Sequence, residues 1–171
     1  MGAPDDNRHA MTTRIIEGNL IVPAAARFAV LASRFNHFIV DRLVEGALDA
    51  LSRHGANMRE VVIVRVPGAW ELPLIARRLA ASDGVDAIIA LGAVIRGTTP
   101  HFDYVAGEAA KGLAGAAHAS RVPIVFGVLT TETVDQAIER AGTKQGNKGW
   151  DAATTAIEMV ALARALDDAG F

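Results

Sequence analysis

Residues 87–105 read AIIALGAVIRGTTPHFDYV, and this stretch contains the local pattern that decides the fold. It opens with the apolar run Ala87–Leu91, in which no polar residue alternates with the apolar ones. Continuous apolar runs of this length are typical of strands buried on both faces, as in a parallel sheet covered by helices. A turn rich in glycine and threonine follows, and a helical pattern begins near Asp103. The stretch therefore predicts one strand–loop–helix unit of an α/β protein.

Three other apolar runs share this character and are expected to be strands: Arg27–Ser33, Val61–Val66 and Val122–Leu129. Helical patterns lie between and after the runs, with the predicted bounds Ile39–His54, Glu71–Ala81, Asp103–Ser120, Thr133–Ala141 and Asp151–Asp168. Alternation of strands and helices indicates right-handed βαβ units. The predicted fold is a flavodoxin-like three-layer α/β/α domain with a four-stranded parallel sheet. The segment Arg14–Val22 also has a β-type pattern, and it predicts an N-terminal edge strand, in this chain or on a neighbouring copy.

Composition narrows the class of protein. The chain has 171 residues, of which 51% are apolar and 21% charged, which is typical of one globular domain. We place this domain at residues 13–171 and expect the polar residues 1–12 to be a disordered tail, since they lack the apolar core of a signal peptide. The absence of cysteine excludes disulfides, thiolate catalysis and zinc sites built on cysteine.

Charge and hydropathy indicate what the protein does not bind. The net charge of −2 provides no basic excess for nucleic acid. No apolar run approaches the roughly 18 residues that a membrane span needs. We therefore expect a cytoplasmic protein that binds neither nucleic acid nor membranes.

Side chains with functional chemistry follow the predicted strands. Phe35 and Asn36 come after the first strand, Trp70 and Glu71 after the second, and His101 after the third. Ligands of open α/β sheets bind beyond the carboxyl ends of the strands, so these residues predict a binding site there. Phe35 could stack on a planar ligand, or it could belong to the core.

The loop after the third strand has the features of an anion site. Gly97, Thr98 and Thr99 precede a predicted helix, whose free amides and positive end would favour a phosphate. A nucleotide-binding P-loop is excluded because Thr98 stands where such a loop needs lysine. The alternative is a glycine turn with a threonine cap. His101 adjoins the loop and is the best acid–base candidate, unless it is only a histidine at a helix start.

A second cationic segment lies near the end of the chain. Arg140 is followed by a glycine-rich stretch with Lys144 and Lys148, which could clamp a phosphate or form a solvated loop. No histidine pair has the spacing of metal ligands, so we expect no metal site.

Four longer motifs together resemble the 6,7-dimethyl-8-ribityllumazine synthase family. They are RFN (34–36), PGAWELP (67–73), GAVIRGTTPHFDYV (92–105) and GVLTTETVDQAIERAGTKQGNKG (127–149). The resemblance runs from about Ile15 to the end of the last helix. It implies a cofactor-independent transferase that acts in the penultimate step of riboflavin synthesis. Such an enzyme condenses 5-amino-6-(D-ribitylamino)uracil with 3,4-dihydroxy-2-butanone 4-phosphate and releases phosphate and water, without a metal.

The resemblance also implies a role for individual residues. His101 would transfer protons, Phe35 would stack on the pyrimidine, and Thr98 and Thr99 would receive the phosphate. The residues that would hold the ribityl-bearing substrate are Ala69, Trp70, Glu71, Ala93, Val94 and Ile95, and Trp70 stands where the family commonly has Phe. Phe126 and Arg140 would enter the site from a neighbouring subunit, Arg140 to pair with the phosphate. Asn36, Lys144 and Lys148 would have supporting roles.

Assembly is implied in the same way. Family members form homo-pentamers, and some join twelve pentamers into an icosahedral shell of sixty subunits, with riboflavin synthase as a possible partner. Shell formers tend to have an uninterrupted loop at the position of Gly142–Gly149, and the loop is uninterrupted here. Three alternatives stay open: an archaeal-type riboflavin synthase-like enzyme, a non-catalytic shell or lumazine-binding paralogue, and an unspecified phosphate-ligand binder of flavodoxin-like shape.

Overall fold

The computed structural model describes residues 13–171, so the predicted tail at residues 1–12 lies outside the described part of the chain. Four parallel strands form the sheet: β1 (Phe28–Ser33), β2 (Val62–Val66), β3 (Ala87–Ile95) and β4 (Ile124–Thr131). Their order is β2-β1-β3-β4. The helices are α1 (His37–Arg53), α2 (Leu72–Ala80), α3 (His101–His118), α4 (Val134–Arg140) and α5 (Lys148–Asp168), and a 3₁₀ turn, η1 (Ala69–Glu71), precedes α2.

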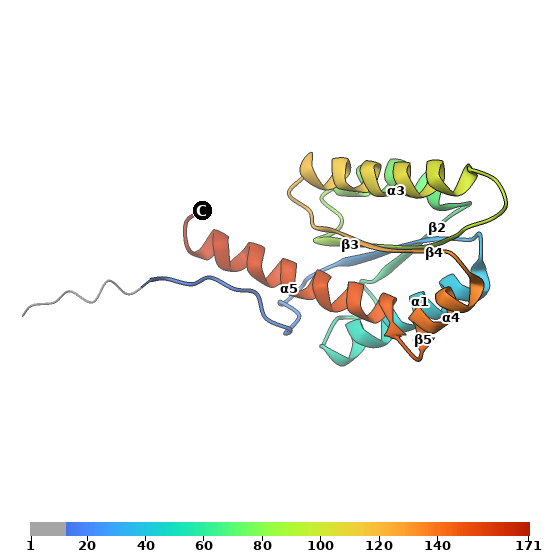
Figure 1. Ribbon diagram of the computed structural model, residues 1–171. Coiled ribbons are helices and arrows are strands. Elements are labelled where there is room, and N and C mark those ends of the chain that lie inside the picture. Colours follow the sequence, from blue (N-terminus) through green and yellow to red (C-terminus); the bar gives the residue numbers. More distant parts are fainter. Residues whose placement is uncertain (1–12) are drawn as a thin grey trace, which may run out of the picture.

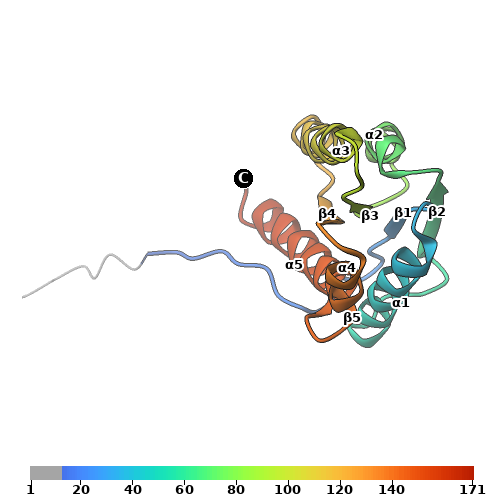
Figure 2. The same ribbon diagram turned by 45° about the vertical axis from the view of Figure 1, so that its right-hand side comes forward.

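Helices cover both faces of the sheet, which confirms the predicted three-layer fold. Figure 1 shows α3 on one side of the sheet and α1, α4 and α5 on the other, and Figure 2 shows α2 beside α3. Each face has its own apolar core. Phe28, Val30 and Ala32 of β1 point toward α1 and α5, whereas Ala29 and Leu31 point toward α2 and α3.

Burial explains why the sequence pattern was informative. All six residues of β1 are buried, and so are the first eight of the nine residues of β3. The runs that form β2 and β4 have the same apolar character, but these two strands lie at the edges of the sheet. The edge strands β2 and β4 leave Val62, Ile63 and Phe126 substantially exposed. Both edges of the sheet therefore have apolar side chains that are exposed in this chain.

The predicted N-terminal edge strand is absent from the sheet in this chain. Residues 14–22 are extended, but they pair with no strand of residues 13–171. The segment instead passes the end of α1, where the Val22 amide donates to the His54 carbonyl at 3.2 Å. Gly18 lies directly against the backbone of Glu158 in α5, where a side chain would not fit. Contact with these two helices leads the segment past the sheet rather than along its edge.

A short hairpin is present that the sequence patterns did not predict. It consists of β5 (Ala141–Thr143) and β6 (Gly146–Asn147), and Gly142 and Gly146 have φ values of 112° and 74°. Asn147 then caps α5, because its side-chain oxygen accepts from the amides of Gly149 and Trp150. For this reason α5 begins at Lys148 rather than at the predicted Asp151.

The small residues of α3 have two different environments. A side chain at Gly112 would meet Pro73 of α2 at 2.7 Å, so this glycine allows the two helices to approach closely. Gly107 and Gly115 have no atom within 4 Å of where a side chain would begin. These two glycines therefore lie on the exposed face of α3, beside Tyr104 and Lys111, without a contact in the described chain.

Candidate functional site

A cavity of about 890 Å³ lies beyond the carboxyl ends of β1, β2 and β3. This is the edge at which the strand order reverses between β1 and β3, where open α/β sheets bind ligands. Its volume is within the range of small-molecule sites. The lining includes most of the residues implied by the resemblance: Phe35, Asn36, Ala69, Trp70, Glu71, Ala93, Val94, Ile95, Thr99 and His101.

Aromatic side chains dominate the cavity mouth. Phe35 is 71% exposed and Trp70 is 56% exposed, so neither belongs to the core. The alternative of a core residue is therefore excluded for Phe35. Large aromatic side chains left in contact with solvent at a cavity are suited to stacking on a flat ring.

Asn36 connects two of the strand ends. Its backbone is in the left-handed region with φ 56°, a conformation that asparagine tolerates better than most residues. The side-chain amide donates to the carbonyl of Ala93 at 2.8 Å. Asn36 therefore holds the loop after β1 against the end of β3, and it uses the carbonyl of Ala93 to do so.

Glu71 has one carboxylate oxygen engaged and one available. Its Oε2 accepts from the amide of Gly68 at 2.8 Å, which fixes the side chain over the turn that precedes α2. The other oxygen forms no hydrogen bond within residues 13–171. A fixed carboxylate with a free oxygen can accept hydrogen bonds from hydroxyl groups of a ligand.

The loop between β3 and α3 is open to an anion. Pro100, not a threonine, stands at the N-cap of α3, and it provides no side-chain hydrogen bond. The alternative of a threonine cap is therefore wrong. The hydroxyls of Thr98 and Thr99 form no hydrogen bond within the described chain, and both residues are exposed. Thr99 lines the cavity, whereas Thr98 does not.

His101 is the first residue of α3, and its exposed side chain lines the cavity beside this loop. A charged cluster lies next to it: Arg96 pairs with Asp103 and with Glu132. Hydrogen bonds from Arg96 to Asp103, and then to Glu132, raise the pKa of the Arg96 guanidinium above its usual value.

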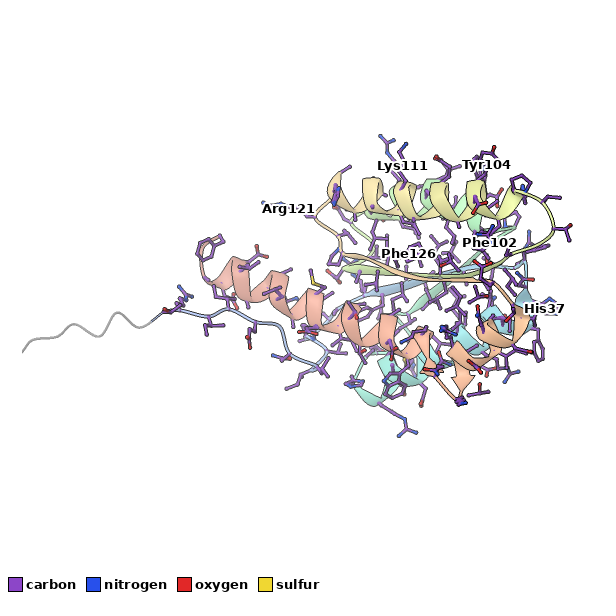
Figure 3. The ribbon with its side chains drawn as sticks, in the orientation of Figure 1. His37, Phe102, Tyr104, Lys111, Arg121 and Phe126 are labelled. Carbon is purple, nitrogen blue, oxygen red and sulfur yellow. The ribbon has the colours of Figure 1, made fainter. Side chains whose placement is uncertain are left out.

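Phe126, Arg140 and Lys148 do not reach this cavity. They line a second hollow of about 350 Å³ along the outer edge of β4 and the start of α5, which shares no residue with the first. Arg140 donates to the carbonyl of Gln136 at 3.0 Å, and Lys148 pairs with Asp151 at 2.6 Å. Figure 3 shows Phe126 on β4, away from the end of the sheet at which His37 lies. Lys144 lies in the turn of the β5–β6 hairpin and lines neither hollow.

Sequence reasoning gave no role to several residues of the first cavity: Pro67, Gly68, Phe102, Tyr104 and Val105. Tyr104 and Val105 follow His101 by three and four positions, a spacing that places side chains on one face of a helix. This spacing from His101 is the sequence feature from which Tyr104 and Val105 could have been predicted to line the cavity. Phe102 lies between α3 and the sheet (Figure 3), where it packs against the Arg96 guanidinium.

Within residues 13–171 there is no group of three or more histidine, aspartate or glutamate side chains that could hold a metal ion. Over the same residues, no helix has the length and apolar character needed to cross a membrane.

Comparison with known proteins agrees with the resemblance seen in the motifs. Residues 25–164 match the family model of 6,7-dimethyl-8-ribityllumazine synthase. The chain is 60% identical to the synthase of that name from Syntrophus aciditrophicus, over 88% of this chain and 97% of the relative. It is 56% identical to that of Aquifex aeolicus and 61% identical to that of Chlorobium phaeobacteroides, in each case over 90% of this chain and 99% of the relative. The extent of these matches shows that the chain belongs to the 6,7-dimethyl-8-ribityllumazine synthase family.

Proposed function

We propose that this protein is a 6,7-dimethyl-8-ribityllumazine synthase. It condenses 5-amino-6-(D-ribitylamino)uracil with 3,4-dihydroxy-2-butanone 4-phosphate and releases phosphate and water. The observation that carries the proposal is the first cavity, which combines exposed aromatic rings, a fixed carboxylate and the hydroxyl of Thr99, with Thr98 in the adjoining loop. These groups match the flat ring, the polyol and the phosphate of the two substrates.

The ribityl-bearing substrate is proposed to bind between Phe35 and the turn at Trp70 and Glu71. A uracil ring gains from stacking on the exposed Phe35. The free oxygen of Glu71 accepts from ribityl hydroxyls, while its other oxygen remains on the Gly68 amide. The chain at Ala93–Ile95 forms the floor of the cavity, and Asn36 keeps it in place through the Ala93 carbonyl.

The phosphate is proposed to bind at Thr98 and Thr99. The amides at the start of α3 and the positive end of the helix favour an anion at this point. A dianion needs more positive charge than one helix end supplies, and the described residues place no lysine or arginine other than the paired Arg96 beside the loop. A cation from outside this cavity is required.

Arg140 of a neighbouring copy is the proposed source of that charge. In this chain Arg140 and Phe126 line the second hollow and stay out of the first. A complete site then forms where the first cavity of one copy meets the β4 edge of the next, with Lys148 in support. The exposed Phe126 agrees with an edge that another copy covers.

The chemistry is proposed to depend mainly on holding the two substrates together. The amine of the uracil derivative attacks the ketone, a Schiff base forms with loss of water, phosphate leaves, and the ring closes. Orientation of two reactants can lower a barrier by about 7–11 kcal/mol. His101 lies beside the phosphate loop, where it moves protons between the substrates, a contribution of roughly 10²–10⁴ in rate.

A homo-pentamer and its shell of sixty chains are the proposed assemblies, with riboflavin synthase as a further partner. Five copies of the 18.0 kDa chain weigh about 90 kDa and sixty weigh about 1,080 kDa. Native mass spectrometry is expected to show the larger species. A mass near that of the pentamer would exclude the shell. The cytoplasmic location stays a prediction from composition.

The decisive experiment is an absorbance and fluorescence assay with both substrates, the purified chain and a control without protein. The control is needed because the two compounds condense slowly unaided. Faster formation of lumazine with one phosphate released per product is the expected result. Lumazine supplied alone tests the alternative of a riboflavin synthase-like enzyme. Absence of acceleration by folded protein would favour a binding or shell paralogue instead.

A further inference from the structure

An arginine at the end of β3 holds both ends of the phosphate loop. Arg96 donates from Nη1 and Nη2 to the two carboxylate oxygens of Asp103, at 3.1 and 3.0 Å. Its Nε donates to Glu132 at 2.6 Å. The guanidinium carbon also lies 4.2 Å from the centre of the Phe102 ring. All three guanidinium nitrogens are thus occupied by carboxylates, while an aromatic ring supports the plane of the group.

The Arg96–Asp103 pair encloses the residues that would receive the phosphate. The chain between the two contains Thr98, Thr99 and His101. The amide of Arg96 donates to the Thr131 carbonyl at 2.9 Å, which attaches this end of the loop to β4. Within the described chain, the amides of residues 97–99 donate to no backbone carbonyl, and Gly97 has open space around it. The loop is therefore held mainly at its ends.

The positive charge of Arg96 is more than neutralised by its partners. Two carboxylates surround one guanidinium, so the cluster has an excess of negative charge and its donors are not free for a phosphate. Arg96 can therefore affect the phosphate only through the position of the loop. An exposed ion pair contributes little to the free energy of unfolding, but a bidentate pair restricts geometry strongly.

We propose that Arg96 is a positioning residue, which holds Thr98, Thr99 and His101 in place for the phosphate-bearing substrate through its bidentate pair with Asp103. Glu132 attaches the same cluster to the β4–α4 connection and has a secondary role. The proposal rests on the proposed function, since it concerns the same site.

The test compares Arg96→Gln, Asp103→Asn and the double variant in the full chain, with separate KM values for the two substrates. Arg53→Gln is the matched control, because Arg53 pairs with Asp49 on α1, away from the cavity. We expect each single change to raise the KM of the phosphate substrate about tenfold, since small displacements of positioning groups are costly. We expect the KM of the uracil substrate to stay within about twofold, because that substrate is held by other groups.

Three comparisons sharpen the test. The double variant should be no worse than either single variant, because both remove the same pair. Arg96→Lys should not restore the wild-type KM of the phosphate substrate, since an ammonium cannot pair with both oxygens of Asp103 and also reach Glu132. Glu132→Gln should have a smaller effect than Asp103→Asn, since the loop stays closed.

The outcomes separate this proposal from the proposed function. A wild-type chain that forms no lumazine would overturn the function itself. An active wild type with Arg96→Gln equal to Arg53→Gln would overturn only the positioning role. Effects on both KM values together with a lower Tm would indicate a general structural role, and additive single effects would show that the two residues do not act as a pair. Either result would contradict the proposal.

Discussion

At the scale of the residue, the site depends on a few side chains whose surroundings differ sharply. His101 is exposed at the start of α3, whereas Glu71 and Asn36 are each held by a hydrogen bond to backbone. Groups held in this way can fix the position of a ligand, and the exposed side chain of His101 can reach a ligand in the cavity.

Replacement of His101 by alanine is expected to slow turnover without abolishing it. Orientation of the substrates would remain, and the loss of proton transfer should lower kcat by roughly 10²-fold. Steady-state kinetics at saturating substrate measure the effect, with His118→Ala at the far end of α3 as the control. A loss as complete as that of an unfolded chain would contradict the assigned role.

Arg140→Gln is expected to act mainly on the phosphate substrate. Removal of its charge should raise the KM of that substrate about tenfold or more, because a charge-assisted bond to phosphate is lost. The KM of the uracil substrate should change little. Lys144→Gln is the matched control, since Lys144 lines neither hollow. An unchanged KM for the phosphate substrate would remove Arg140 from the site.

At the scale of the element, the start of α5 depends on one side chain. Asn147 accepts from the amides of Gly149 and Trp150, and its amide nitrogen donates to the Arg42 carbonyl of α1 at 2.8 Å. Gly149 lies against the backbone of Leu43, where no side chain would fit. The cap and the close contact together hold the start of α5 against α1.

Asn147→Ala is expected to lower the free energy of unfolding by about 1–2 kcal/mol, because it removes the cap of α5. Asn147→Asp should lower the free energy of unfolding less, since aspartate keeps the acceptor for the helix amides and loses only the donor to the Arg42 carbonyl. Chemical unfolding followed by circular dichroism measures both. Equal stability of the alanine variant and the wild type would show that the cap is not needed.

At the scale of the whole molecule, the two hollows are the two halves of a proposed site that adjacent copies share. The first cavity and the β4 edge have no lining residue in common. A chain with either half damaged should therefore complement a chain with the other half damaged.

Assemblies that contain equal amounts of Glu71→Gln and Arg140→Gln chains test this arrangement. With the phosphate substrate well below its KM, random mixing leaves about a quarter of the junctions with two intact halves, so activity should rise above the baseline by about a quarter of the wild-type value. Each variant assembled alone provides the baseline. Mixed assemblies no more active than that baseline would place both residues in the site of one chain.

The sequence by itself determined the layers and most of the first cavity. Continuous apolar runs predicted β1 and β3 because both strands are buried on both faces, and residues at strand ends share one edge in any parallel sheet. Local spacing is enough for such features. For residues 14–22 the β-type pattern predicted an edge strand, which the sheet of this chain does not contain because the segment contacts α1 and α5 instead; pairing with a neighbouring copy stays a prediction.

Only the tertiary structure decided which functional residues meet. It brings Asn36 to the carbonyl of Ala93, and it closes the loop between Arg96 and Asp103. It also places Arg140 and His101 in different hollows. These residues are distant along the chain or lie on different elements. The physical reason is that hydrophobic periodicity is a pattern of residues that are neighbours along the chain. Hydrogen bonds and ion pairs between elements depend instead on the order and packing of the strands.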